Sequence, residues 1–217
     1  MNKKKILIIG AGWYGCHIGI FLKKKGHNVL IYEKNSDIFL GSSGYNQFRL
    51  HTGYHYPRSS ETIEETKRNF QKFKKLYKNF IFYPSNNIYC IAKKRSLIDS
   101  LTYKTILKAN NLNFYKKKFK FLKNIEDSYI SNEGVLLNTK IKKFYKKKLS
   151  KNIIYNKHVI NSKELTDKYD FVIDCTNTLL NKSLNKSFKY VLTISLIYKK
   201  KKNSIVYPIT IMDGQLP

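Results

Sequence analysis

The chain opens on two short apolar runs that flank an amphipathic segment. Residues 6–9 and residues 29–32 are the two apolar runs. Between them, apolar positions recur with the helical period to about residue 25, and Gly26 follows. Because a glycine-rich turn joins the first run directly to the amphipathic segment, the pattern predicts a β–α–β unit.

The turn itself has the glycine spacing of a dinucleotide-binding loop. Gly10 allows a sharp turn off the strand, Gly12 lets backbone N–H groups approach a pyrophosphate, and Gly15 permits close helix packing. Glu33 lies 21 residues after Gly12, where a carboxylate can accept both hydroxyls of an adenosine ribose and repel a 2′-phosphate. The pattern therefore predicts a nucleotide site that comprises Gly10, Ala11, Gly12, Trp13, Tyr14, Gly15, Glu33 and Lys34.

A secretory signal is the alternative interpretation of this segment, because lysines 3–5 precede the apolar run. His17 interrupts the apolar pattern, and lysines 23–25 end it early. No small-residue cleavage site follows. The pattern favours the nucleotide-binding unit.

Further elements follow from the periodicity of the remaining chain. Helices are expected from about residue 62, with Thr62 and Glu65 as a capping box, over 96–110, and from Asn138 to about residue 149. Residues 190–198 and 204–212 alternate with the strand period and predict an antiparallel hairpin. Other expected strands, of which the last is expected to be buried, lie within residues 82–92, 111–115, 133–137, 153–155, 158–160 and 169–177.

Net charge and cysteine content narrow the function classes. The formal charge is +28, but only four of the 42 basic residues are arginine. Arginine is the residue best suited to recognise bases and to form bidentate hydrogen bonds with phosphates. We therefore expect no specific nucleic-acid partner. Three scattered cysteines indicate a reducing, cytoplasmic location, and no apolar stretch has the length of a transmembrane helix. The sequence predicts no oligomeric state.

Residues 35–57 form a long segment without sustained period, rich in Gly, Ser, Asn, His and Tyr. A loop of this length within a compact domain is usually functional. From residue 41 it reads GSSGYNQFRLHTGYHYP, which resembles the segment after the second strand in FAD-dependent oxidoreductases of the D-amino-acid oxidase superfamily. Residues 169–177 are similar to a later strand of that family.

The resemblance implies an α/β architecture with two discontinuous domains. A Rossmann-like FAD domain is expected to cover residues 1–78 and 150–185. A substrate domain on an antiparallel sheet is expected to cover 79–149 and 186–217 and to be incomplete at its end. Because a closing C-terminal segment of the family is not found in these 217 residues, we expect them to be catalytically incompetent alone.

The resemblance also implies roles for single residues around FAD. Ser43, Asn46, Gln47 and His51 would line the flavin side. Val159 would meet the adenine edge through its backbone. Thr176, followed by Asn177, stands where the family commonly has an Ala/Thr-Gly pair, which limits close approach of the backbone there.

These observations lead to a functional hypothesis with alternatives. The favoured function is FAD-dependent oxidation of a small amine- or hydroxyl-bearing substrate by hydride transfer, with His51 as hydrogen-bond partner or base. A loop-packing role of His51 stays open, and Arg49 and Arg58 are either substrate ligands or loop-ordering residues. The alternative functions are those of a nucleotide-binding or glycan-pathway protein without redox turnover and of an NAD-dependent dehydrogenase. A metal site at His51 and His55 is disfavoured, because no Cys or acid lies nearby in sequence.

Overall fold

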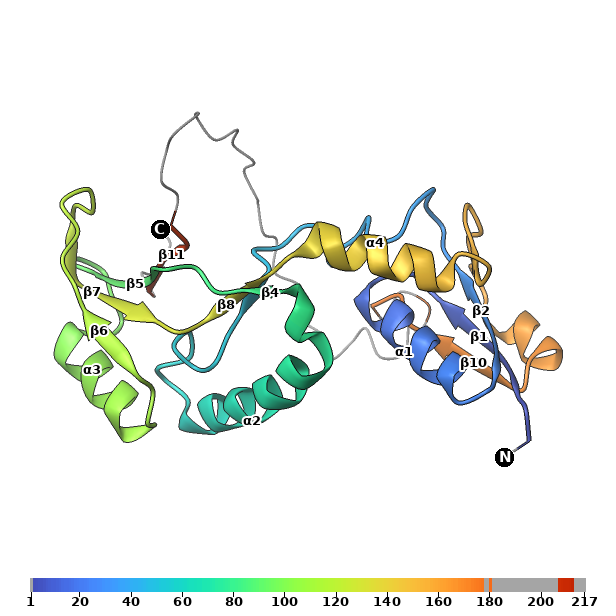
Figure 1. Ribbon diagram of the computed structural model, residues 1–217, viewed down its shortest axis with the longest axis horizontal. Helices are drawn as coiled ribbons and strands as arrows, with labels where there is room; N and C mark the ends of the chain where they lie inside the picture. The colour runs from blue at the N-terminus through green and yellow to red at the C-terminus, as the bar shows by residue number, and fades with distance from the viewer. Residues whose placement is uncertain (1, 178–179, 181–206, 213–217) are drawn as a thin grey trace. The chain divides into compact units, whose positions relative to one another are not determined.

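The computed structural model describes residues 2–177, 180 and 207–212 (Figure 1). The chain divides into two compact units. The first unit consists of Met1–Gln47 and Asn138–Tyr198, and the second of Phe48–Leu137 and Lys199–Pro217.

The first unit is built on a parallel sheet in the order β10-β1-β2-β9. Its strands are β1 (Lys5–Ile9), β2 (Asn28–Tyr32), β9 (Ile153–Ile154) and β10 (Phe171–Asp174). Leu7, Ile8 and Ile31 are fully buried, as expected when both faces of a parallel sheet are covered. The predicted β–α–β unit is present, and the Rossmann-like fold is confirmed.

Helix α1 (Trp13–Lys24) lies against this sheet, and helix α4 (Asn138–Leu149) packs beside α1 (Figure 1). A Cβ on Gly19 of α1 would lie 2.8 Å from Cδ1 of Ile31, so the glycine permits close packing on β2. Helix α4 buries Tyr145, whose ring meets the rings of Trp13 and Phe39 at 6.0 and 5.8 Å. These aromatic contacts connect the glycine loop to α4.

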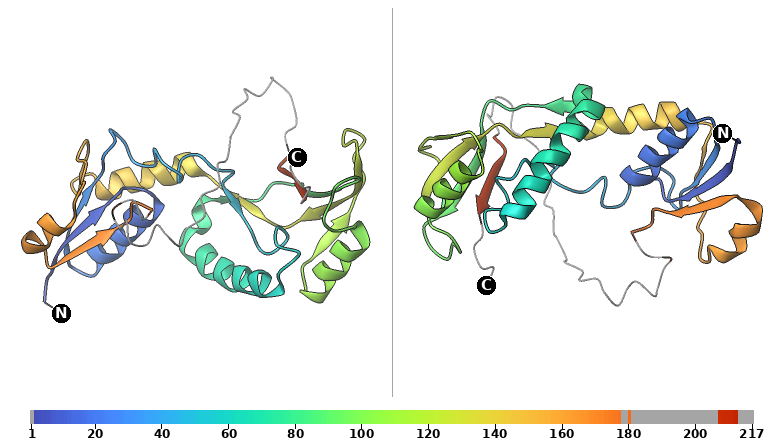
Figure 2. Two further views of the ribbon diagram at one scale, coloured as in Figure 1. Left: turned by 180° about the vertical axis from the view of Figure 1, so that it is seen from behind. Right: turned by 90° about the horizontal axis from the view of Figure 1, so that it is seen from below.

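The second unit contains a sheet in the order β11-β5-β7-β6. Its strands are β5 (Asn87–Ala92), β6 (Phe114–Lys116), β7 (Ile125–Ser131) and β11 (Ile209–Met212). Neighbours β5, β7 and β6 are antiparallel, whereas β11 is parallel to β5. Helix α3 (Ser100–Ala109) lies beside this sheet in both views of Figure 2.

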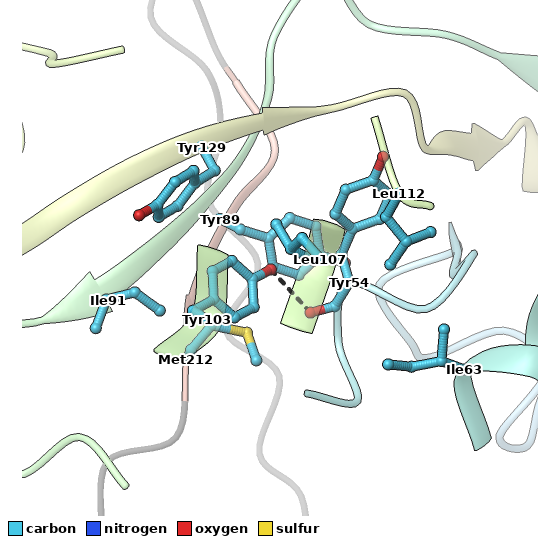
Figure 3. Close-up of a cluster of buried hydrophobic side chains, with 9 residues drawn as sticks. All are labelled: Tyr54, Ile63, Tyr89, Ile91, Tyr103, Leu107, Leu112, Tyr129 and Met212. Atoms are coloured by element: carbon cyan, nitrogen blue, oxygen red, sulfur yellow. Dashed lines mark hydrogen bonds between the residues drawn. The ribbon is translucent and has the colours of Figure 1, made fainter. Parts of the chain in front are cut away.

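A core rich in tyrosine joins α3 to this sheet (Figure 3). Tyr103 of α3 donates its hydroxyl proton to the carbonyl oxygen of Tyr54 at 2.9 Å. Its ring lies 5.3 Å from that of Tyr129 on β7. The buried residues of this cluster are Tyr54, Ile63, Tyr89, Ile91, Tyr103, Leu107, Leu112, Tyr129 and Met212.

A small antiparallel sheet, in the order β3-β8-β4, completes the second unit together with α2. Its elements are β3 (Arg49–Leu50), α2 (Ser60–Tyr77), the 3-10 turn η1 (Lys78–Phe80), β4 (Ile81–Phe82) and β8 (Gly134–Leu136). The first unit has a further 3-10 segment, η2 (Lys163–Lys168). No helix within the described residues is long and apolar enough to cross a membrane.

Several element boundaries differ from the sequence prediction. Helix α2 is capped by Ser59, whose Oγ accepts the Thr62 N–H at 3.2 Å, so the Thr62 capping box was wrong. Helix α3 begins later than expected, because Asp99 accepts the Thr102 N–H and fixes its first turn.

Two strand predictions also need correction. Residues 158–160 form no strand, because the Val159 side chain packs on Leu7 and Ile9 instead. Strand β10 is not buried as predicted, since Phe171 is 56% exposed at the edge of the described sheet. The expected strand over 190–198 lies outside the described residues.

The unit boundaries also differ from the predicted domains. Residues 48–78 belong to the second unit, because β3 pairs with β8 and Ile63 of α2 lies in the tyrosine-rich core. Residues 138–149 belong to the first unit, because α4 packs beside α1. Sequence periodicity located these elements but carried no information about which sheet they join.

Candidate functional site

The glycine loop of the first unit lies where β1, β2 and β10 end. Gly10 has φ +100°, and a Cβ there would lie 2.8 Å from the carbonyl oxygen of Cys175. The Gly10 N–H donates to the Tyr32 carbonyl at 2.7 Å. The backbone N of Thr176 would be 3.6 Å from that Cβ, so the structure brings predicted site residue Thr176 to the loop. Only glycine combines this conformation with this close approach.

The loop leads into the N-terminus of α1, which lacks an acidic residue in its first turn. The Trp13 N–H donates to Ser43 Oγ at 2.9 Å, and a Cβ on Gly12 would lie 3.2 Å from the same oxygen. A Cβ on Gly15 would lie 1.9 Å from the Gly10 carbonyl oxygen. The absence of side chains at these positions lets the loop backbone pack closely at the positive end of a helix dipole. That arrangement fits a pyrophosphate.

Glu33 follows β2 and points its carboxylate into the glycine loop. Its Oε2 accepts the Ala11 N–H at 2.7 Å. Its Oε1 accepts the backbone N–H and side-chain amide of Asn35 at 2.9 and 2.8 Å. A carboxylate offers about four acceptor positions, and these three bonds leave about one for a ribose hydroxyl. Accepting both ribose hydroxyls, as the sequence predicts, therefore requires Asn35 to release one of its two hydrogen bonds to Glu33.

The other predicted residues of the first unit have varied surroundings. Tyr14 is 76% exposed, and Lys34 and Gln47 are also exposed. The exposed Asn46 donates its side-chain amide to the Ser42 carbonyl at 2.9 Å. The buried Val159 side chain packs on β1, so its own role toward adenine stays a prediction.

His51, the predicted catalytic residue, belongs to the second unit. Its Nδ1 lies 3.2 Å from the Tyr89 hydroxyl and 3.6 Å from Oε2 of Glu133. The Tyr89 hydroxyl donates to the same Oε2 at 2.5 Å. The Glu133 side chain is fully buried, and its Oε1 accepts the Thr52 N–H at 2.5 Å. The histidine is therefore one end of a buried polar cluster.

Arg49 borders this cluster from β3. Its guanidinium lies over the Tyr89 ring, 4.9 Å from the ring centre. Its two terminal nitrogens are hydrogen-bonded to Thr210 and Asn87, whereas Nε is buried without a hydrogen-bond partner among the described residues. These contacts favour the loop-ordering role over the substrate-ligand role that the sequence left open.

Sequence reasoning missed Tyr89 and Glu133. Tyr89 lies within an apolar strand, where it matches the pattern of a core residue. Glu133 precedes Gly134 in what looks like an exposed turn. No signal in the sequence pairs them, because it is the register of β5 against β7 that brings residue 89 opposite residue 129 and residue 87 opposite residue 131.

The cysteines are poor candidates for catalysis. All three are free. Burial and the Glu33 carboxylate raise the pKa of Cys16 to about 12, and burial raises the pKa of Cys90 and Cys175 to about 11. A thiol with such a pKa is protonated at neutral pH and is not a nucleophile. Within the described residues, no three His, Cys, Asp or Glu side chains are grouped to hold a metal ion.

Comparison with known proteins places the chain in a family. The family model of FAD-dependent oxidoreductases (DAO) matches residues 5–113. FAD-dependent monooxygenase FPY4 of Fusarium mangiferae is 32% identical over 185 residues, which cover 81% of this chain and 50% of that protein. The chain therefore spans about half the length of this relative.

Two solved structures have a similar fold. Glycine oxidase from Geobacillus kaustophilus matches with a TM-score of 0.57 and 15% identity, over 74% of this chain and 49% of that one. FAD-bound L-alpha-glycerophosphate oxidase from Mycoplasma pneumoniae matches with a TM-score of 0.55 and 18% identity, over 74% and 47%. Together with the glycine loop, Glu33 and the parallel sheet, the family match confirms FAD as the cofactor predicted from sequence. The chain belongs to the DAO family of FAD-dependent oxidoreductases.

Proposed function

We propose that the first unit holds the ADP part of FAD and that the protein oxidises a small amine- or hydroxyl-bearing substrate. The observation that carries the first part is the backbone cradle at Gly10, Gly12 and Gly15, directly beside the Glu33 carboxylate. A diphosphate and a ribose are the two groups that this pair of features suits.

Each residue of the cradle has a separate task in this proposal. The backbone around Gly12 and the α1 dipole stabilise the pyrophosphate charge. Ser43 Oγ, which already accepts the Trp13 N–H, can donate its own proton to a phosphate oxygen. Glu33 accepts a ribose hydroxyl at the opposite end of the loop.

The oxidation separates a hydride from a proton. FAD supplies the acceptor for the hydride that leaves the substrate carbon. The proton of the substrate N–H or O–H needs a base of the protein, and we assign that role to His51. A neutral imidazole suits this role near neutral pH.

A hydroxylating reaction is the second candidate, because FPY4 is named a monooxygenase. Such a reaction consumes NADH or NADPH and incorporates one oxygen atom from O₂, whereas simple dehydrogenation does neither. Non-redox nucleotide binding, which the sequence left open, is not favoured, because the chain belongs to a family of FAD-dependent oxidoreductases. It predicts no flavin reduction by any substrate. The three free thiols also support the proposed cytoplasmic location.

Ligand titration and flavin bleaching test these assignments separately. ADP, FAD and NAD are titrated into the purified chain by calorimetry, and binding of ADP and FAD in preference to NAD is expected. Anaerobic bleaching of the FAD-loaded protein by a panel of amino and hydroxy acids then tests dehydrogenation. NADPH consumption under air identifies the monooxygenase reaction. If the titrations detect no binding of ADP or FAD, the cofactor assignment is contradicted.

A further inference from the structure

The cluster around Glu133 fixes the direction of a chain of hydrogen bonds. Tyr89 has a single hydroxyl proton, and it lies 2.5 Å from Oε2 of Glu133. Burial, followed by the Glu133 charge, raises the pKa of Tyr89 far above its ordinary value, so this hydroxyl keeps its proton. A carboxylate can only accept, and therefore Tyr89 is the donor in this bond.

This donor assignment determines the protonation of His51. Because Tyr89 has used its only proton, its oxygen can act toward His51 Nδ1, at 3.2 Å, only as an acceptor. Nδ1 must then carry a hydrogen. In a neutral imidazole that leaves Nε2 with the free lone pair, which is the nitrogen able to take a proton from another molecule.

We propose that Tyr89 and Glu133 are positioning residues that hold His51 in the Nδ1–H tautomer, with Nε2 as the proton acceptor. The proposal rests on the proposed function in assigning the base to His51. It adds that the tautomer of this base is set by two residues on other segments of the second unit. Nothing in the proposal depends on where the first unit lies.

The surroundings of the cluster support a fixed geometry. Thr52, the residue after His51, donates both its N–H and its hydroxyl to Oε1 of Glu133, at 2.5 and 3.3 Å. The carboxylate is therefore tied to the backbone beside the histidine as well as to Tyr89. Tyr89 itself is fully buried in the tyrosine-rich core (Figure 3). Both partners of His51 have little freedom to move.

Charged and titratable groups also face His51 from its other sides. The His55 ring stacks on it at 4.7 Å, and the Tyr56 ring meets both histidines edge-on. Arg49 lies behind Tyr89, over its ring. After His51 takes a proton, Oε2 of Glu133, 3.6 Å from Nδ1, can balance the new charge. This arrangement resembles the logic by which an acid orients a catalytic histidine.

The test reads the tautomer directly, before any cofactor or substrate is added. Nitrogen-15 NMR of the chain with labelled histidine distinguishes a protonated Nδ1 from a protonated Nε2. We expect His51 to carry its hydrogen on Nδ1 in the native chain. In Tyr89→Phe, which keeps the ring and removes the hydroxyl, we expect the resonances to shift toward the Nε2–H form that dominates in free histidine.

Two further variants separate positioning from simple packing. Tyr103→Phe removes the hydroxyl of another fully buried tyrosine in the same core and should leave the His51 resonances unchanged. Glu133→Gln should alter the His51 resonances in the same way as Tyr89→Phe. If the Glu133→Gln protein does not fold, the result for Tyr89→Phe alone decides the outcome. Predominant Nε2–H in the native chain, or no difference between native and Tyr89→Phe, overturns the proposal.

Kinetics of the FAD-loaded protein then connect the tautomer to turnover. With a substrate found in the bleaching panel, Tyr89→Phe should lower kcat by about 10- to 100-fold with little change in KM, the scale seen when an orienting partner is removed. Tyr103→Phe should stay within about twofold of the native rate. An unchanged kcat in Tyr89→Phe contradicts the positioning role. If the native chain has the Nδ1–H tautomer but binds no FAD, the proposed function is contradicted and the tautomer assignment stays intact. Absence of turnover by these 217 residues alone is the result that the sequence predicts.

Discussion

Ala11 donates its backbone N–H to Oε2 of Glu33 across 2.7 Å, and this bond ties the glycine loop to the end of β2. The carboxylate that is expected to meet the ribose therefore also holds the loop in shape. Asn35 completes the arrangement with two donors to Oε1. Glu33 therefore has a structural role, and we expect it to have a ligand-binding role as well, so substitutions there should affect both.

Glu33→Gln should lower the free energy of unfolding and weaken ADP binding together. A glutamine amide has one oxygen, so its NH₂ group must face either the Ala11 donor or the Asn35 donors. We expect a loss of about 1–3 kcal/mol in stability. The affinity for ADP should fall by about tenfold or more. Urea denaturation and calorimetric titration measure the two effects.

The matched control for that substitution is Glu64→Gln on α2. The Glu64 side chain is 63% exposed and pairs with Lys67 on the helix surface. An exposed pair of this kind contributes little, so stability should change by less than about 0.5 kcal/mol, with no change in ADP affinity. Equal ADP affinity in Glu33→Gln and the native chain would show that Glu33 does not contact the ribose.

A series of glycine-to-alanine substitutions separates backbone strain from collision in the first unit. Gly41 has neither positive φ nor a neighbour within 4 Å of a Cβ, so alanine should stabilise by about 0.4–1 kcal/mol. Gly26 has φ +88° and open space, so alanine should destabilise by about 1 kcal/mol. Gly10 combines φ +100° with a collision between the added Cβ and the Cys175 carbonyl oxygen. Gly10→Ala should therefore lower the free energy of unfolding by about 1–3 kcal/mol more than Gly26→Ala does. Stability is measured by thermal or urea denaturation. If Gly26→Ala is less stable than Gly10→Ala, this account of the loop is contradicted.

Ser43→Ala should weaken the start of α1 and the pyrophosphate site. Removing Oγ leaves the Trp13 N–H without its acceptor, which costs about 1 kcal/mol in helix-capping bonds of this kind. ADP affinity should fall, whereas affinity for adenosine, which lacks phosphates, should change little. Ser42→Ala next to it is the control, since the Ser42 side chain is exposed. A parallel loss of adenosine and ADP binding would place Ser43 away from the phosphates.

Asp37 should make stability depend on pH. Burial alone would raise the pKa of Asp37, but Lys142 and Lys146, each at 3.0 Å, outweigh it and hold this pKa below the usual 3.8. A depressed folded pKa contributes stability that is present above the unfolded pKa and is lost as pH falls through the folded value. Asp37→Asn should therefore cost about 0.5–1 kcal/mol at pH 7.

The difference between Asp37→Asn and the native chain should shrink below about pH 4 and at high salt. Denaturant titrations at several pH values measure it. Asp167→Asn, at an exposed position of η2, serves as the control and should follow the native curve. A gap that widens as the pH falls would contradict the ion-pair explanation.

The sequence by itself determined the first β–α–β unit and its glycine-rich turn. Gly10, Gly12, Gly15 and Glu33 lie where the pattern predicted, at the junction of β1, α1 and β2. This was possible because a strand, its turn and the next helix are contiguous. Their geometry depends on local conformational preferences and on the hydrophobic period, and both follow directly from the order of residue types along the chain.

Tertiary structure alone decided the surroundings of His51 and the allocation of elements to units. Glu133 and Tyr89 are 82 and 38 residues away from His51 in the chain, and strand register brings them together. Helix α4 follows β8 directly but packs beside α1. Hydrophobic period shows that such a helix has an apolar face, but which partner buries that face depends on long-range packing. The residue type likewise does not show whether a glutamate is buried or exposed, because that depends on its neighbours in the folded structure.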